Sequence, residues 1–208
     1  MEAVILIHGI WMKSIIMQPM AARLRKAGFQ THCFSYPSVY KTPAQNARLF
    51  ARFARSVSAD KVHFVAHSLG GIVLMHYFHE NKETRPGRVV MLGSPVKGSS
   101  NAKIINNLPL FRLALGESIE QGLLGDIPAW GNQRQLGMIA GSKSLGVGNL
   151  LGRSHAPNDG AVLIEETRIP QLADHITLPV SHSGMLLSAK VSEQIIHFIE
   201  NGYFLFNP

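Results

Sequence analysis

The stretch that most constrains the fold is residues 61–79, KVHFVAHSLGGIVLMHYFH. Its first part, residues 61–66, is short, apolar and rich in β-branched and aromatic side chains, which is typical of a buried strand. From Gly70 onward, apolar residues recur at a spacing that predicts a helix packed against that strand. Ser68 lies at the turn between the two elements, where small neighbours would let the strand and helix backbones come close and leave the serine hydroxyl exposed.

Strands and helices alternate along the rest of the chain. Short apolar runs predict strands at residues 4–7, 31–34, 61–66, 88–92, 135–140 and 175–178. Helical periodicity, together with proline and glycine at suitable ends, predicts helices at residues 19–28, 42–57, 70–79 and 186–200, the last with Leu187 on its apolar face. This alternation predicts an α/β fold with a doubly wound, mostly parallel sheet of about six strands.

Length and composition predict one domain over residues 1–208. The chain has 208 residues, of which 46% are hydrophobic and 16% charged, enough for one well-buried core. No apolar run approaches the ~20 residues of a membrane-spanning helix. The apolar residues 3–7 are too few for a signal peptide and lack a basic leader. The single cysteine, Cys33, fits a reducing compartment, so we expect a cytoplasmic protein.

The formal net charge of +7 suggests attraction to acidic substrates or anionic lipid surfaces. Arg48, Arg52 and Arg55 would share one helix face, which makes peripheral contact with an anionic membrane one expectation and an ordinary solvated face the other. No recognised nucleic-acid motif accompanies the charge. No H-E-x-x-H, paired-cysteine or calcium-loop pattern is present, so no metal or cofactor is expected. The sequence leaves the oligomeric state open.

Two motifs carry a resemblance to a known family. A-H-S-L-G-G at residues 66–71 resembles the nucleophile elbow of the α/β-hydrolases, and H-G-I-W at residues 8–11 resembles their oxyanion turn. The resemblance implies that Ser68 is the nucleophile and that the backbone amides of Ile10 and Leu69 hold the oxyanion.

The same resemblance assigns supporting roles to the neighbours of these groups. We expect Trp11 and His67 to contribute to substrate binding, and His8 to brace the turn that it begins. Ser94, in a G-S-P-x-x-G-S stretch similar to one in many lipases, is a second serine in a loop, but the proline after it prevents an elbow, so we expect a structural role.

In this family the catalytic groups follow the order serine, acid, histidine, each in a loop after a strand. His182 is the only histidine beyond Ser68 that lies after a strand and also follows the best acid. That acid is Asp159, in an N-D-G stretch that resembles the acid loop of bacterial lipases. Asp174 would lie at the amino end of its strand, and Glu165 and Glu166 are the reserve acids.

Taken together, these motifs make the chain similar to small bacterial lipases. The resemblance implies a serine hydrolase that cleaves a small-molecule or lipid acyl ester through Ser68, His182 and Asp159. A thioesterase or acyltransferase would use the same groups, and a non-catalytic scaffold that binds anionic membranes is the rival from another class. The apolar residues 101–130 form either a lid-like insertion or a core helix pair; the sequence does not separate these two.

Overall fold

The computed structural model describes residues 1–100, 102, 115–145 and 156–205 of the chain. Six strands form one sheet in the order β2-β1-β3-β4-β5-β6, and every neighbouring pair is parallel. They are β1 (Glu2–Ile7), β2 (Gln30–Phe34), β3 (Lys61–His67), β4 (Val89–Leu92), β5 (Leu136–Gly141) and β6 (Asp174–Leu178). The expected parallel sheet of about six strands is confirmed, while the single-domain organisation stays a prediction.

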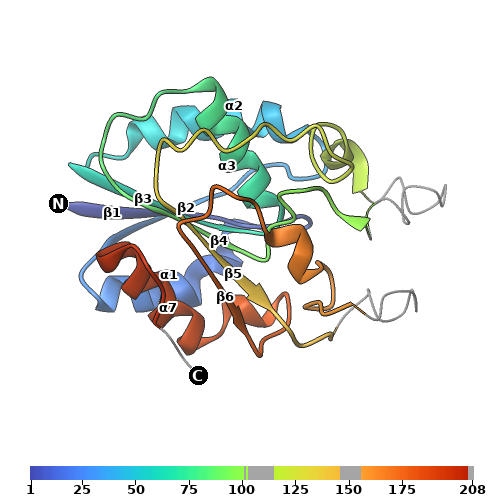
Figure 1. The fold of residues 1–208 in the computed structure, drawn as a ribbon. Coiled ribbons are helices and arrows are strands. Elements are labelled where there is room, and N and C mark those ends of the chain that lie inside the picture. Colours follow the sequence, from blue (N-terminus) through green and yellow to red (C-terminus); the bar gives the residue numbers. More distant parts are fainter. Residues whose placement is uncertain (101, 103–114, 146–155, 206–208) are drawn as a thin grey trace.

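Helices cover both faces of the sheet (Figure 1). On one face lie α2 (Pro43–Ser56) and α3 (Leu69–Glu80), and on the other lie α1 (Gln18–Lys26) and α7 (Ala189–Asn201). Short 3-10 helices occur at Ser14–Met17, Gly116–Ile119, Ile164–Thr167 and Gly184–Leu186. Among the described residues, no helix is long and apolar enough to cross a membrane.

Alternate side chains of the central strands enter two apolar cores. In β1, Ile5 and Ile7 belong to the core with α2 and α3, whereas Val4 and Leu6 belong to the core with α1 and α7. All four side chains are fully buried. Because helices cover both faces, each central strand is an apolar run without a polar face, which is why the short runs in the sequence predict it well.

The order of the strands reverses between β1 and β3. From β1 the chain crosses to β2 at one edge, then returns to place β3 on the other side of β1. In open parallel sheets, the crevice outside the carboxyl ends of two such strands is the usual place for a ligand. The turn at residues 8–11 and the turn at Ser68 follow these two strands, so the topology places both turns at that crevice.

The final helix begins later than the periodicity predicts. Its N-cap is Ser188, whose hydroxyl accepts a hydrogen bond from the N–H of Val191 at 3.3 Å. Leu187 therefore precedes the helix, and its side chain is 58% exposed. The expectation that Leu187 belongs to the apolar face was wrong, because the serine cap sets the start of the helix after it.

The described part of the apolar insertion packs into the core. Leu115, Ile119, Leu123 and Trp130 are buried in the cluster that also holds α3. His76 of α3 approaches the backbone carbonyl of this segment at Gln121, with an Nε2–O distance of 2.6 Å. For residues 115–130 this packing favours a core role over a lid, while residues 101 and 103–114 lie outside the described part of the chain.

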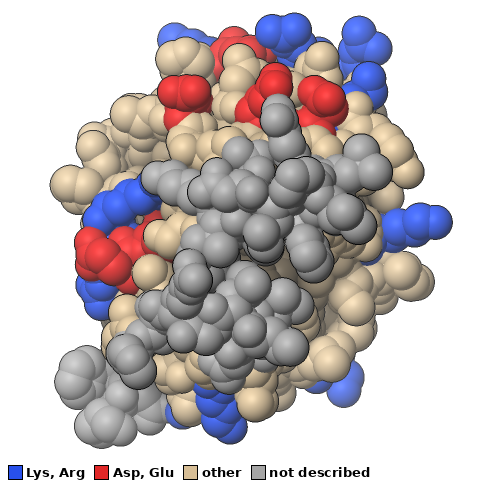
Figure 2. Space-filling model, turned by 90° about the vertical axis from the view of Figure 1, so that its right-hand side faces the viewer, with Lys and Arg blue, Asp and Glu red and all other residues tan. Residues whose placement is uncertain are grey.

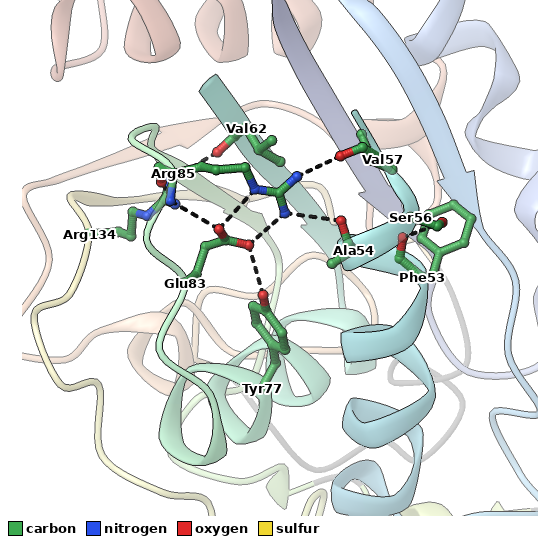
Figure 3. Close-up of polar contacts among 9 residues, drawn as sticks. All are labelled: Phe53, Ala54, Ser56, Val57, Val62, Tyr77, Glu83, Arg85 and Arg134. Carbon is green, nitrogen blue, oxygen red and sulfur yellow. Dashed lines mark hydrogen bonds and ion pairs between the residues drawn. The ribbon is translucent and has the colours of Figure 1, made fainter. Parts of the chain in front are cut away.

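A polar cluster lies at the opposite end of the sheet from the turns at residues 8–11 and Ser68 (Figure 3). Arg85 donates to both carboxylate oxygens of Glu83, at 2.9 and 2.8 Å, and the hydroxyl of Tyr77 donates to the same carboxylate at 2.9 Å. The Arg85 guanidinium also donates to the carbonyls of Ala54 and Val57 at the end of α2. The loop between α3 and β4 is thus tied to α2, away from the turns after β1 and β3.

We predict that His63 makes the protein less stable in acid. The side chain is fully buried, its Nδ1 accepts from the N–H of Arg88 at 3.1 Å, and burial lowers its pKa to about 4. Between about pH 6.5 and pH 4 the unfolded chain binds a proton that the folded chain does not. The free energy of unfolding should therefore decrease as the pH is lowered through this range, by up to about 1.4 kcal/mol per pH unit from this one group.

The measurement is urea unfolding of the wild type and His63→Gln at several pH values in this range. The variant should lose stability less steeply with falling pH, whatever its stability at neutral pH. Equal slopes for the two proteins would contradict the assignment.

Candidate active site

Ser68 lies at the turn between β3 and α3 in a backbone conformation that is unusual for serine. Its φ is 53° and its ψ is −122°. Such positive φ values cost conformational energy for a residue with a β carbon, so the surrounding contacts must hold the turn in place. The Ser68 N–H donates to the carbonyl of Leu92 in β4 at 2.9 Å, and its carbonyl accepts from Gly71 at 3.0 Å. The serine is 6% exposed.

Gly70 allows the first turn of α3 to touch the end of β1. A β carbon at this position would lie 2.7 Å from the carbonyl oxygen of His8 and 2.9 Å from that of Ile7. Such distances are too short for any side chain, and both contacts are with backbone atoms that cannot move aside. The expected close approach of helix and strand at this turn is therefore observed.

The turn at residues 8–11 lies directly beside Ser68. A β carbon on Gly9 would be 3.1 Å from the β carbon of Ser68. His8 braces the turn, as expected: its Nδ1 lies 2.8 Å from the carbonyl of Gly9, and its Nε2 accepts from the N–H of Tyr36 at 3.3 Å. Tyr36 stacks on the His8 ring with centroids 4.4 Å apart and donates its hydroxyl to the His8 carbonyl at 2.8 Å. Burial lowers the pKa of His8, consistent with a neutral ring that donates through Nδ1.

The buried Asp159 and the partly buried His182 form a pair in the loops after β5 and β6. The His182 Nδ1 lies 2.7 Å from Oδ2 of Asp159, and the His182 backbone N–H donates to the Asp159 carbonyl at 2.8 Å. The other carboxylate oxygen accepts from the backbone N–H groups of Ala161 and Val162 at 3.0 and 2.8 Å. Asp159 is 1% exposed, so nearly all of its stabilisation comes from these donors.

The reserve acids have other partners. Glu165 is exposed and pairs with Lys97 at 2.5 Å. Glu166 is buried and accepts from the backbone N–H groups of Ser100 and Leu163. Asp174 accepts from the N–H of Phe204 at 2.7 Å, at the amino end of β6. Among the described acids, Asp159 is the one that the fold brings to His182.

The other residues singled out from the sequence occupy different environments. Trp11 is 60% exposed, and its backbone N–H donates to the hydroxyl of Ser38 at 3.1 Å. Ser94 is fully buried, and its hydroxyl has no hydrogen-bond partner among the described residues. His155, which precedes Asp159 in the chain, lies outside the described residues.

His67 makes a contact that the sequence did not predict, while its expected contribution to substrate binding stays a prediction. Its side chain is fully buried, its Nε2 lies 3.0 Å from the carbonyl oxygen of His182, and the two rings are 4.6 Å apart. This contact joins residues 115 positions apart, and no pattern in the sequence signals it. The sequence also gave no sign that Gly93 packs against the acid and the histidine. A β carbon there would lie 2.9 Å from Oδ2 of Asp159 and 3.1 Å from Nδ1 of His182.

Figure 2 looks onto the side of the molecule at which the strands end, the right-hand side of Figure 1. The visible Lys, Arg, Asp and Glu side chains lie around the margin of this face, and the described surface nearer the middle is formed by other residues. Among the described residues, no cluster of three or more His, Cys, Asp and Glu side chains could hold a metal ion.

The family model of the alpha/beta hydrolases, described as "Alpha/beta hydrolase family", matches residues 4–187. The chain belongs to this family. No curated protein sequence matches it. The expected α/β-hydrolase fold is thereby confirmed.

Solved structures similar to this alpha/beta hydrolase include several esterases and lipases. Mature lipase BlEst2 of Bacillus licheniformis matches with a TM-score of 0.70 at 21% identity, over 95% of this chain and 90% of that chain. A metagenomic carboxyl esterase matches with a TM-score of 0.69 at 15% identity, over 86% and 64%. Phospholipase PlaB of Legionella pneumophila matches with a TM-score of 0.61 at 17% identity, over 81% and 45%. At these identities the likeness shows the fold alone.

We predict that Gly93→Ala separates Asp159 from His182. Gly93 has a φ of 53°, so alanine would add backbone strain of about 1–2 kcal/mol as well as a methyl group against the pair. Gly131→Ala is the control for the added methyl group alone, since Gly131 has no positive φ and nothing lies within 4 Å of a β carbon there.

The measurement is proton NMR of the His182 Nδ1 proton, which a hydrogen bond to a carboxylate shifts strongly downfield. The signal should be lost in Gly93→Ala and kept in Gly131→Ala, with both variants folded by circular dichroism. An unchanged signal in Gly93→Ala would show that the pair does not depend on this glycine.

Proposed function

We propose that this alpha/beta hydrolase is a serine esterase that cleaves carboxylic acyl esters, with Ser68 as nucleophile, His182 as general base and Asp159 as the supporting acid. The observation that carries the proposal is the position of His182. Its ring nitrogen is 2.7 Å from a buried carboxylate on one side, and its ring lies against the residue that precedes the strained serine on the other. Activation of the serine further requires that His182 Nε2 reach the Ser68 hydroxyl, and this is the contact that the proposal assigns.

The proposed reaction uses each group in turn. His182 accepts the proton of the Ser68 hydroxyl as the serine oxygen bonds to the ester carbonyl carbon. The tetrahedral intermediate then expels the alcohol, which takes that proton from the imidazolium. Water attacks the carbonyl of the resulting acyl-enzyme as the same histidine takes its proton, and the histidine returns that proton to the Ser68 oxygen as the carboxylic acid leaves. Throughout, Asp159 holds the imidazole orientation and stabilises its charge.

The oxyanion is assigned to the backbone amides of Ile10 and Leu69. The assignment is supported by the contact between the two turns that carry them: Gly9 lies against Ser68, and Gly70 lies against His8. Two fixed N–H groups aimed at a developing negative charge are typically worth several kcal/mol in the transition state. None of the proposed steps calls for a cofactor.

The proposed substrates are small-molecule or lipid acyl esters. Solved structures with this fold are described as a lipase, a carboxyl esterase and a phospholipase. The exposed Trp11 belongs to the turn that contacts Ser68, which suits an apolar substrate group. Acyl transfer to another alcohol or cleavage of a thioester would use the same groups. The cytoplasmic location stays a prediction.

The test is labelling by a fluorophosphonate probe together with hydrolysis of p-nitrophenyl esters of increasing chain length. Ser68→Ala should lose the label and at least about 1,000-fold in kcat while remaining folded. Ser94→Ala is the matched control, because it removes another buried serine hydroxyl that has no described partner. It should keep both the label and the activity.

Several results would overturn the proposal. An active, folded Ser68→Ala protein would remove the nucleophile, and loss of label in Ser94→Ala alone would move it to the other loop. A folded wild type with neither label nor hydrolysis would favour the binding-scaffold alternative, which predicts salt-sensitive binding to anionic liposomes. Product analysis with an added alcohol separates hydrolysis from acyl transfer.

A further inference from the structure

The residue before the nucleophile has a contact that packing alone does not require. The imidazole of His67 is fully buried, and its Nε2 lies 3.0 Å from the backbone carbonyl oxygen of His182. A carbonyl oxygen only accepts hydrogen bonds, so the proton is on Nε2 and His67 is the donor. Nδ1 then carries no proton in the neutral ring.

The other ring nitrogen confirms this assignment of the proton. Among the described residues, Nδ1 of His67 has no hydrogen-bond partner, and it faces Gly9, where a β carbon would lie 3.0 Å away. A second proton would place a buried N–H against this glycine with no acceptor. Burial, and next the charge of neighbouring His182, hold the pKa of His67 well below its usual value, so the ring stays neutral.

An apolar side chain would fill the same space at lower cost. Leaving a buried acceptor unpartnered typically costs about 1–3 kcal/mol, which an aliphatic residue would avoid. What histidine adds at this position is the Nε2 donor, and that donor reaches the backbone of His182. The contact is therefore the part of His67 that needs explanation.

The backbone of His182 is held on both sides of its α carbon. Its N–H donates to the carbonyl of Asp159 at 2.8 Å, and its carbonyl accepts from His67 at 3.0 Å. One contact comes from the acid and the other from the residue bonded to the nucleophile. Any displacement of the serine turn would thus carry the proposed base with it.

We propose that His67 is a positioning residue that fixes the loop of His182 relative to Ser68 through its Nε2–H. The inference rests on the proposed esterase function. Because the His67 ring is fully buried and contacts the backbone of His182, its loss should slow the chemical step and leave KM nearly unchanged. Misplacement of a catalytic group by about 1 Å typically lowers the rate on the order of 100-fold.

The test compares two variants of similar size. In glutamine the amide nitrogen is as many bonds from the β carbon as Nε2 is in histidine, so His67→Gln retains a donor at the right reach. His67→Met fills similar space without any donor. We expect His67→Gln to stay within about tenfold of wild-type kcat and His67→Met to lose on the order of 100-fold. Both values are taken per active site titrated with the phosphonate probe.

A structural role alone would lower the titratable fraction and thermal stability of both variants without changing kcat per titrated site. Equal kcat values for His67→Gln and His67→Met would overturn the inference. If the wild type itself is neither labelled nor active, the proposed function fails instead, so the two failures are distinguishable.

A measurement on the wild type keeps the inference testable even where a variant does not fold. Nitrogen-15 NMR of the labelled protein should show His67 protonated at Nε2 and bare at Nδ1 at neutral and higher pH. A His67 ring that titrates in this range, or that carries its proton on Nδ1, would overturn the inference.

Discussion

The structure depends on one close approach between backbones. The first turn of α3 lies against the end of β1 and the residue after it. Only glycine fits at position 70, because a β carbon there would overlap the carbonyl oxygens of Ile7 and His8. This contact lets the central strand turn sharply into α3 and holds Ser68 at positive φ. It also places the turn after β1 beside the serine. A residue with a side chain at this position would separate the two turns that the proposed oxyanion site requires.

Around this contact the site is held mostly by backbone hydrogen bonds. Asp159 accepts two backbone N–H groups as well as the His182 ring, and His8 is held between the Gly9 carbonyl and the Tyr36 N–H. Such contacts change little with side-chain motion, and they place the polar groups before any substrate arrives. Preorganisation of this kind lowers a reaction barrier without further rearrangement.

The sequence predicted the sheet because its signals are local. Buried parallel strands are short apolar runs between helices, and the turn at Ser68 is marked by adjacent small residues. The pairing of Asp159 with His182 was predicted as well, from the resemblance to the α/β-hydrolases, whose acid and histidine follow the serine in that order in loops after strands. Leu187 was misassigned because a single cap hydrogen bond from Ser188 decides where α7 begins.

Contacts that depend on exact placement were beyond sequence reasoning. The bond from His67 to the His182 carbonyl joins residues 115 positions apart, and the place of Gly93 against the acid–histidine pair depends on how three loops meet. Neither has a spacing that repeats along the chain. The sequence also did not decide whether the apolar insertion is a lid or part of the core, because apolar residues suit both; residues 115–130 pack in the core with α3.

The most direct test of the account is a crystal structure of the protein after reaction with a fluorophosphonate, whose adduct resembles the tetrahedral intermediate. The account predicts a phosphorus bonded to the Ser68 oxygen and a phosphonyl oxygen about 3 Å from the amide nitrogens of Ile10 and Leu69. An adduct on another residue, or a phosphonyl oxygen turned away from both amides, would contradict it.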